Sequence, residues 1–203
     1  MKDSVVLYIH GQGGSTEETA HYVPLFPNCD VIGLDYHAQT PWEAREEFPR
    51  MFDTVCGPYQ SVAVIANSIG AFFAMHALRD KPIDKAFFIS PIVDMQKLIE
   101  DMMIWADVSE DELREKGEIE TAFGQTLSWE YLTYVRAHPV NWPVPTRILY
   151  GSRDHLTSLA TVSAFAEKIN APLAVMDGGE HWFHTEEQMQ FLDTWIMEEN
   201  RHV

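Results

Sequence analysis

Short apolar runs and longer amphipathic runs alternate along most of this chain. The short runs are rich in β-branched and aromatic residues, and the alternation is typical of βαβ units that build a parallel sheet. Both faces of the short runs are apolar, as expected for strands that helices cover on each side. The pattern predicts six strands, at residues 5–9, 30–34, 61–66, 85–90, 146–150 and 173–176. All but one of the connections between them are expected to be a single helix.

The longer runs predict the helices that flank this sheet. The segment that begins at Ser68 is apolar almost all round, which indicates a deeply buried helix. Apolar residues spaced by three and four over 159–169, and again over 191–196, predict two further helices. The run 42–55 has a helical pattern as well, and Pro49 is expected to kink or divide that helix.

The connection after the fourth predicted strand is much longer than the others. About fifty residues, from 94 to 141, separate this strand from the next, which far exceeds an ordinary connection. An apolar stripe over 95–103 predicts one helix, Ser109 with Glu112 forms a capping-box sequence that opens a second, and 129–137 predicts a third. We therefore expect an insertion at about 94–141 with helices of its own.

Composition and charge limit the classes of protein and partner. The chain has 203 residues, of which 46% are hydrophobic and 22% charged, and this favours one globular domain over 1–203. Asp plus Glu number 31 against 14 Lys plus Arg, giving a formal net charge of −17 that repels phosphate backbones and anionic lipids. We expect neither nucleic acid nor a membrane as partner. The acidity by itself names no substrate, and a cationic substrate stays open.

Cysteine use and the N-terminal sequence indicate a compartment. Cys29 and Cys56 are the only cysteines and have no paired-ligand spacing, so neither a disulfide framework nor a thiolate metal site is expected. The apolar run 5–9 is too short for the core of a signal peptide, and no run approaches the ~20 apolar residues of a membrane span. We expect a cytoplasmic protein in a reducing compartment.

A serine lies between a predicted buried strand and the predicted buried helix. Ser68 has Ala66 two residues before it and Gly70 two residues after it. This segment resembles the nucleophile elbow of the α/β-hydrolases, with alanine in place of the first glycine. The resemblance implies that Ser68 is the nucleophile and that the Ile69 amide is an oxyanion donor. A serine that only caps the helix after a strand would look similar.

A glycine-rich loop follows the first predicted strand. His10 is followed by Gly11, Gln12 and two more glycines, in the place where the α/β-hydrolases carry their oxyanion loop. The resemblance implies that the backbone N–H of Gln12 is the second oxyanion donor, with Gly11 as the alternative, and that His10 is structural. A phosphate-binding loop is the competing interpretation, but no Lys follows the glycines and the spacing does not fit.

An acid and a base occur in the order that this resemblance requires. Asp154 comes just after the strand predicted at 146–150, and His181 follows a Gly-Gly-Glu turn after the last strand. The order Ser68, Asp154, His181 is that of the α/β-hydrolases and not that of the chymotrypsin-like or subtilisin-like proteases. A serine hydroxyl needs a base to activate it, and the base needs an anion to orient it. These three residues supply one of each.

Other residues compete for these roles. His184 is an alternative base, and His155 beside Asp154 is a second one. Asp94 follows the fourth predicted strand, where some α/β-hydrolases carry their acid. A zinc site is disfavoured because no complete set of carboxylate and imidazole ligands has the usual spacing.

The resemblance covers the chain from His10 to His181 and implies both a fold and an activity. It implies an α/β-hydrolase fold with a trimmed, mainly parallel sheet of six strands in the order 2-1-3-4-5-6 and a helical cap at about 94–141. The implied activity is that of a carboxylesterase-like serine hydrolase, which cleaves a small-molecule ester, amide or thioester through an acyl-enzyme and needs no cofactor or metal. A non-catalytic binding module on this scaffold, and an acyltransferase or perhydrolase with the same residues, are the alternatives.

Overall fold

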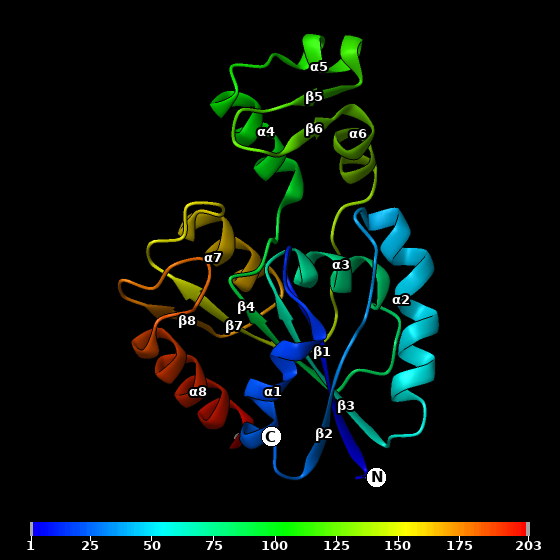
Figure 1. The fold of residues 1–203 in the computed structure, drawn as a ribbon, viewed down its shortest axis with the longest axis vertical. Coiled ribbons are helices and arrows are strands. Elements are labelled where there is room, and N and C mark those ends of the chain that lie inside the picture. Colours follow the sequence, from blue (N-terminus) through cyan, green and yellow to red (C-terminus); the bar gives the residue numbers. More distant parts are fainter. Residues whose placement is uncertain (1, 202–203) are drawn as a thin grey trace. The chain divides into compact units, whose positions relative to one another are not determined.

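The computed structural model describes residues 2–201, which form two compact units (Figure 1). The first, which we call the body, takes in the described residues up to Val93 and from Asn141 onward. The second, which we call the insertion, is Asp94–Val140. Each unit is described by itself below. That the insertion acts as a cap stays a prediction.

The body is built on a six-stranded parallel sheet. Its strands lie in the order β2-β1-β3-β4-β7-β8, which is the expected order of the six strands counted along the body. Every neighbouring pair is parallel. The strands are β1 Ser4–Ile9, β2 Cys29–Gly33, β3 Ser61–Asn67, β4 Lys85–Ile89, β7 Thr146–Gly151 and β8 Leu173–Met176. The predicted parallel sheet is confirmed, with strand ends that differ from the sequence prediction by at most one residue.

Helices cover both faces of this sheet, as Figure 1 shows. The crossovers through α2 (Pro41–Cys56), α3 (Ile69–Ala77) and α7 (Leu159–Lys168) all advance in one direction across the sheet, whereas the first connection runs in the opposite direction. Because such crossovers are right-handed, the first connection lies on the other face. It shares that face with α8 (Glu186–Arg201), where Tyr22, Phe26, Leu192 and Trp195 pack against the strands.

The edges of the sheet are less covered than its centre. Residues of β1, β3 and β4 are almost completely buried, whereas every residue of β2 is half-buried. On β8, Val175 is 41% exposed. An apolar run therefore does not show by itself that a strand is buried. The two edge strands, β2 and β8, have a neighbouring strand on one side only and are more exposed than the central ones.

Two helical predictions need correction. The helix over 41–56 is neither divided nor ended at Pro49, which lies inside it. Its buried face, with Ala44, Phe48 and Phe52, packs on α3, and this tertiary packing outweighs the backbone hydrogen bond that a proline cannot donate. The connection from β1 to β2 is not one helix but three consecutive short turns, η1 Thr16–Glu18, α1 Thr19–Tyr22 and η2 Val23–Leu25.

The insertion contains the three predicted helices and a hairpin that the sequence did not indicate. The helices are α4 Met95–Trp105, α5 Glu110–Lys116 and α6 Trp129–Ala137. The hairpin pairs β5 (Glu118–Glu120) with β6 (Thr126–Ser128), and Gly124 at its turn has a φ of 81°. Each strand has three residues, which is too short to show an alternating pattern. Ion pairs from Arg136 to Glu110 and Glu100 tie its helices together.

Hydrogen exchange should be faster in the insertion than in the centre of the sheet. The insertion is small, and its buried hydrophobic residues are eight: Met95, Leu98, Ile99, Met103, Leu113, Leu127, Leu132 and Val135. A small unit with a small apolar core opens at a lower free energy than a central strand. Amide exchange measured by mass spectrometry should therefore be faster over 95–137 than over β3. Equal protection in both would contradict this prediction and would mean that the insertion unfolds only with the body.

Candidate active site

Ser68 sits on a strained turn between β3 and α3. Its φ is 50° and its ψ is −121°, a conformation that a residue with a side chain rarely adopts. The last residue of β4 and the segment after it hold this turn from both sides. The N–H of Ser68 donates to the carbonyl of Ile89 at 3.0 Å, and the N–H of Ile92 donates to the carbonyl of Ser68 at 3.1 Å. The serine is therefore fixed at the carboxyl edge of the sheet.

Small residues beside Ser68 are required by the close approach of neighbouring chain segments. A Cβ on Gly70 would lie 2.3 Å from the carbonyl oxygen of His10 and 2.8 Å from that of Ile9. A Cβ on Gly11 would lie 3.2 Å from the Cβ of Ser68. The elbow and the glycine-rich loop therefore pack directly on one another. This is the physical reason for the small residues that the sequence shows at both places.

Ser68, His181 and Asp154 lie in one hydrogen-bonded chain. Nε2 of His181 is 2.8 Å from Oγ of Ser68, and its Nδ1 is 2.7 Å from Oδ2 of Asp154. Two glycines bring the loops that carry the acid and the base together. A Cβ on Gly151 would lie 2.5 Å from the carbonyl group of Gly179, so only glycine fits at this crossing.

The Asp154 carboxylate is fixed on both of its oxygens. Its side chain is fully buried, and Oδ1 accepts the backbone N–H groups of Leu156 at 2.8 Å and Thr157 at 3.2 Å. Oδ2 is left for Nδ1 of His181. Hydrogen bonds to the charged form stabilise a buried carboxylate. Burial, and to a lesser extent the charge of Asp154, raises the pKa of Tyr150.

The two expected oxyanion donors occupy different positions around the serine. Gln12 lies in the tight turn that the N–H of Gly14 closes onto the carbonyl of Gly11 at 3.1 Å, and it lines the cavity described below. Ile69 is the first residue of α3, directly after Ser68, where the backbone N–H groups of a helix have no partner within the helix. Both roles stay predictions.

The competing residues have other contacts. Nδ1 of His184 is 2.7 Å from the carbonyl oxygen of Trp182, and the two rings are stacked. His155 is exposed. Asp94 caps α4 by accepting the N–H of Lys97 at 2.9 Å. The carboxylate that contacts His181 is that of Asp154.

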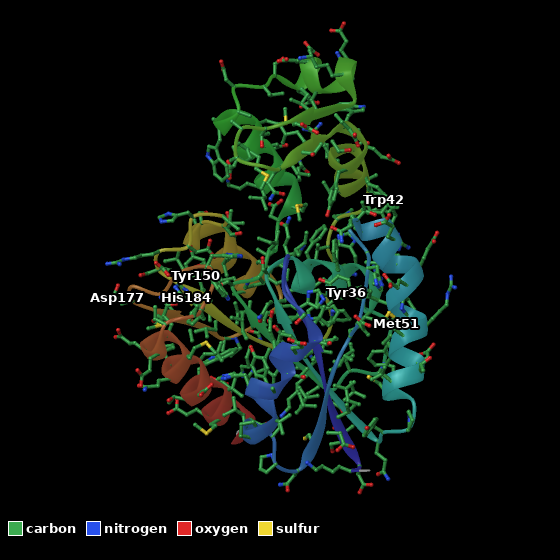
Figure 2. All side chains as sticks on the ribbon, viewed as in Figure 1. Tyr36, Trp42, Met51, Tyr150, Asp177 and His184 are labelled. Carbon is green, nitrogen blue, oxygen red and sulfur yellow. The ribbon has the colours of Figure 1, made fainter. Side chains whose placement is uncertain are left out.

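His10 has structural contacts. Its ring stacks on Tyr36 at 4.3 Å, and its backbone carbonyl accepts the Tyr36 hydroxyl at 2.8 Å. Figure 2 shows Tyr36 on the α2 side of the body and Tyr150 on the side of β7 and β8. His10 therefore anchors the glycine-rich loop to the packing around α2.

A cavity of about 630 Å³ opens beside Ser68 and His181. This volume lies in the usual range for small-molecule sites. The walls come from the body alone: the glycine-rich loop, the turns before β2, the elbow, the end of β4, the loops after β7 and β8, and α8. Its lining includes seven apolar or aromatic residues, Tyr22, Ile89, Leu156, Trp182, Phe183, Met189 and Leu192, and four polar ones, Gln12, Glu18, His21 and Asn67.

A polar cluster in this cavity wall was not predicted from the sequence. The buried Tyr8 hydroxyl donates to Glu18, and Nδ2 of Asn67 donates to that hydroxyl at 2.8 Å. Burial, followed by Tyr22 and the Glu18 hydrogen bond, raises the pKa of Tyr8 and keeps its hydroxyl protonated. One signal was available, since Ser15 and Glu18 form a capping box. Nothing in the sequence indicated that this box borders the cavity.

The described residues include no group of metal ligands and no membrane-spanning helix, and both cysteines are free thiols. Within 2–201, no group of three or more His, Cys, Asp or Glu side chains is placed to hold a metal ion. Cys29 and Cys56 are free, and burial raises the pKa of the Cys56 thiol to about 12, so it is no nucleophile. No described helix combines the length and the apolar character needed to span a bilayer.

Comparison with known proteins identifies the fold. The sequence matches no family model and no curated protein, so the comparison rests on solved structures. Among solved structures, Est1E from Butyrivibrio proteoclasticus has a TM-score of 0.78 at 19% identity, over 99% of this chain and 88% of its own. Mouse alpha/beta hydrolase domain-containing protein 10 has a TM-score of 0.79 at 14% identity, over 98% and 90%. The Pyrococcus furiosus esterase Pf2001 has 0.62 at 19%, over 97% and 83%. The chain has the α/β-hydrolase fold, as its sequence predicted.

Proposed function

We propose that this protein is a serine hydrolase that cleaves a carboxylic ester of a small molecule through an acyl-enzyme. The observation that carries the proposal is the hydrogen-bonded chain from Ser68 through His181 to the buried Asp154, with distances of 2.8 and 2.7 Å. A nucleophile, a base and an orienting anion are the three parts that acyl transfer by a serine needs. The adjoining cavity gives room for a substrate.

The geometry supports a two-step reaction. Oγ of Ser68 attacks the ester carbonyl while Nε2 of His181 takes its proton, and the Gln12 and Ile69 amides stabilise the oxyanion. The carbon–oxygen bond to the alcohol then breaks as His181 gives the proton to the leaving oxygen. A water molecule attacks the acyl-enzyme, transfers a proton to His181, and releases the carboxylic acid as Ser68 regains its proton. No cofactor or metal takes part.

Structural neighbours support the ester class. Pf2001 is described as an esterase, and Est1E has been solved with ferulic acid bound. A carboxylic acid is the product that ester cleavage releases. Amides and thioesters would use the same groups, and so would acyl transfer to an acceptor other than water. The competing class is a binding module on this scaffold that performs no chemistry.

A fluorophosphonate probe should label the folded protein once, on Oγ of Ser68. The oxygen forms a bond to phosphorus and fluoride leaves, which requires a serine with an adjacent base and oxyanion donors. Intact mass and peptide mapping would measure the stoichiometry and the site. Heat-unfolded protein should not react. Labelling at another residue, or no labelling of a folded sample, would favour the binding module.

A further inference from the structure

The cavity beside Ser68 has one carboxylate in an otherwise apolar or neutral wall. Glu18 lines it together with Tyr22, Trp182 and other apolar residues. Among the described residues of the lining there is no lysine or arginine. Besides His181, the lining has one further histidine, His21. Its Nε2 is 2.7 Å from Oδ1 of Asp193, so a proton gained there already has a carboxylate partner. The charge of Glu18 is therefore not balanced within the cavity.

Glu18 is also held in a fixed position. One carboxylate oxygen accepts the N–H of Ser15 at 3.1 Å, and the other accepts the hydroxyl of the fully buried Tyr8. The glycine-rich loop packs against it, since a Cβ on Gly14 would lie 2.5 Å from its Oε1. Both hydrogen-bond donors are neutral, so they orient the carboxylate without neutralising it. Each oxygen keeps a lone pair for a further donor.

We infer that the preferred substrate is an ester whose acyl or alkyl chain is apolar and carries an ammonium group, which Glu18 receives. The apolar walls suit the chain, and the Glu18 carboxylate suits the ammonium group. The formal charge of −17 favours the approach of cations and disfavours esters with a carboxylate or phosphate. This inference rests on the proposed hydrolase function and adds the substrate class to it.

A purely structural role is the alternative for Glu18, because it completes a capping box and binds Tyr8. Glu18→Gln separates the two roles. Glutamine has a single amide oxygen, so it can accept from Ser15 or from Tyr8 but not from both, and it has no charge. Thermal unfolding therefore measures the structural cost of the lost hydrogen bond, and the ester preference measures the loss of charge. Glu17→Gln is the matched control. It removes the same charge one residue away, at an exposed position outside the cavity lining.

The test compares three p-nitrophenyl esters of similar length, those of ε-aminocaproic acid, heptanoic acid and pimelic acid. Their chains end in an ammonium, a methyl and a carboxylate group. The glycine and propionic acid esters repeat the comparison with a short chain. The measured quantity is the ratio of kcat/KM for the ammonium ester to that for the methyl ester, after subtraction of spontaneous hydrolysis. Comparing variants on the same esters cancels their intrinsic reactivity.

The wild-type ratio should favour the ammonium ester at one chain length at least, with the carboxylate ester the poorest substrate. Glu18→Gln should lower this ratio about fivefold, the upper end for an exposed ion pair, since solvent weakens the attraction at an exposed carboxylate. Glu17→Gln should leave it within about twofold of wild type. Equal effects of the two variants, or no preference in the wild type, would overturn the inference.

A second measurement needs no variant. Hexylammonium should protect Ser68 of the wild type from the fluorophosphonate probe at a lower concentration than hexanol does, and added salt should reduce the difference. Equal protection by the two compounds would overturn the inference even if Glu18→Gln failed to fold. If Ser68 is labelled and the esters are cleaved without preference, only the substrate class is wrong. If Ser68 is not labelled and no ester is cleaved, the proposed function itself is wrong.

Discussion

Ser68→Ala should lower kcat for a short p-nitrophenyl ester by on the order of 10⁶-fold, as loss of the nucleophile does in other triads. The nucleophilic oxygen is lost, while His181 and Asp154 stay in place. The fold should be retained, because the Ser68 side chain makes no capping hydrogen bond to α3. Steady-state kinetics would measure the loss, and circular dichroism with thermal unfolding would report on the fold.

A second serine provides the control for this variant. Ser158 caps α7 by accepting the N–H of Thr161 at 3.2 Å, and it is exposed. Ser158→Ala should lower the free energy of unfolding by about 1 kcal/mol and leave kcat unchanged. The opposite pattern, with Ser68→Ala active but destabilised, would mean that Ser68 is only a helix cap.

Asp154→Asn should lower kcat for the same ester by on the order of 10⁴-fold, with little change in KM. The asparagine has one carbonyl oxygen, and the N–H groups of Leu156 and Thr157 require an acceptor at the Oδ1 position. The amide nitrogen then faces Nδ1 of His181 and donates to it. This places the histidine proton on Nε2, so that His181 cannot accept the proton of Ser68.

Asp94→Asn is the matched control for the choice of acid. Asp94 caps α4, and asparagine is an equally good cap, so kcat should stay within about tenfold of wild type. The reverse ranking of the two variants would assign the orienting role to Asp94. Near-full activity in both would mean that another group orients His181.

The pattern of the amino-acid sequence was sufficient to predict the parallel sheet, and the resemblance to the α/β-hydrolases implied its strand order. The strands are apolar runs of four to seven residues between amphipathic helices, and right-handed parallel crossovers are compatible with the implied order. Ala66 and Gly70 marked the elbow because the spacing of small residues records a steric requirement along a single stretch of chain. The order of Ser68, Asp154 and His181 could likewise be read directly from the sequence.

Features that leave no local pattern, or that depend on contacts between distant segments, could not be predicted in this way. The hairpin β5–β6 has strands too short to leave a pattern. Pro49 lies within a continuous helix because the packing of α2 on α3 outweighs a local preference. The approach of Gly151 to Gly179, which brings the acid to the base, joins two loops whose glycines look like ordinary turn residues in the sequence.

The sequence by itself determined the strands, the elbow and the identity of three candidate residues, because each is encoded in local periodicity or in a motif, and the strand order followed from the resemblance that these motifs carry. Only the tertiary structure decided that Oγ of Ser68, the ring of His181 and the buried carboxylate of Asp154 share one hydrogen-bonded chain. It also decided that the Glu18 carboxylate faces the same cavity. The physical reason is that hydrogen bonding and uncompensated charge depend on distances between segments far apart in the chain, which chain folding sets and local pattern does not record.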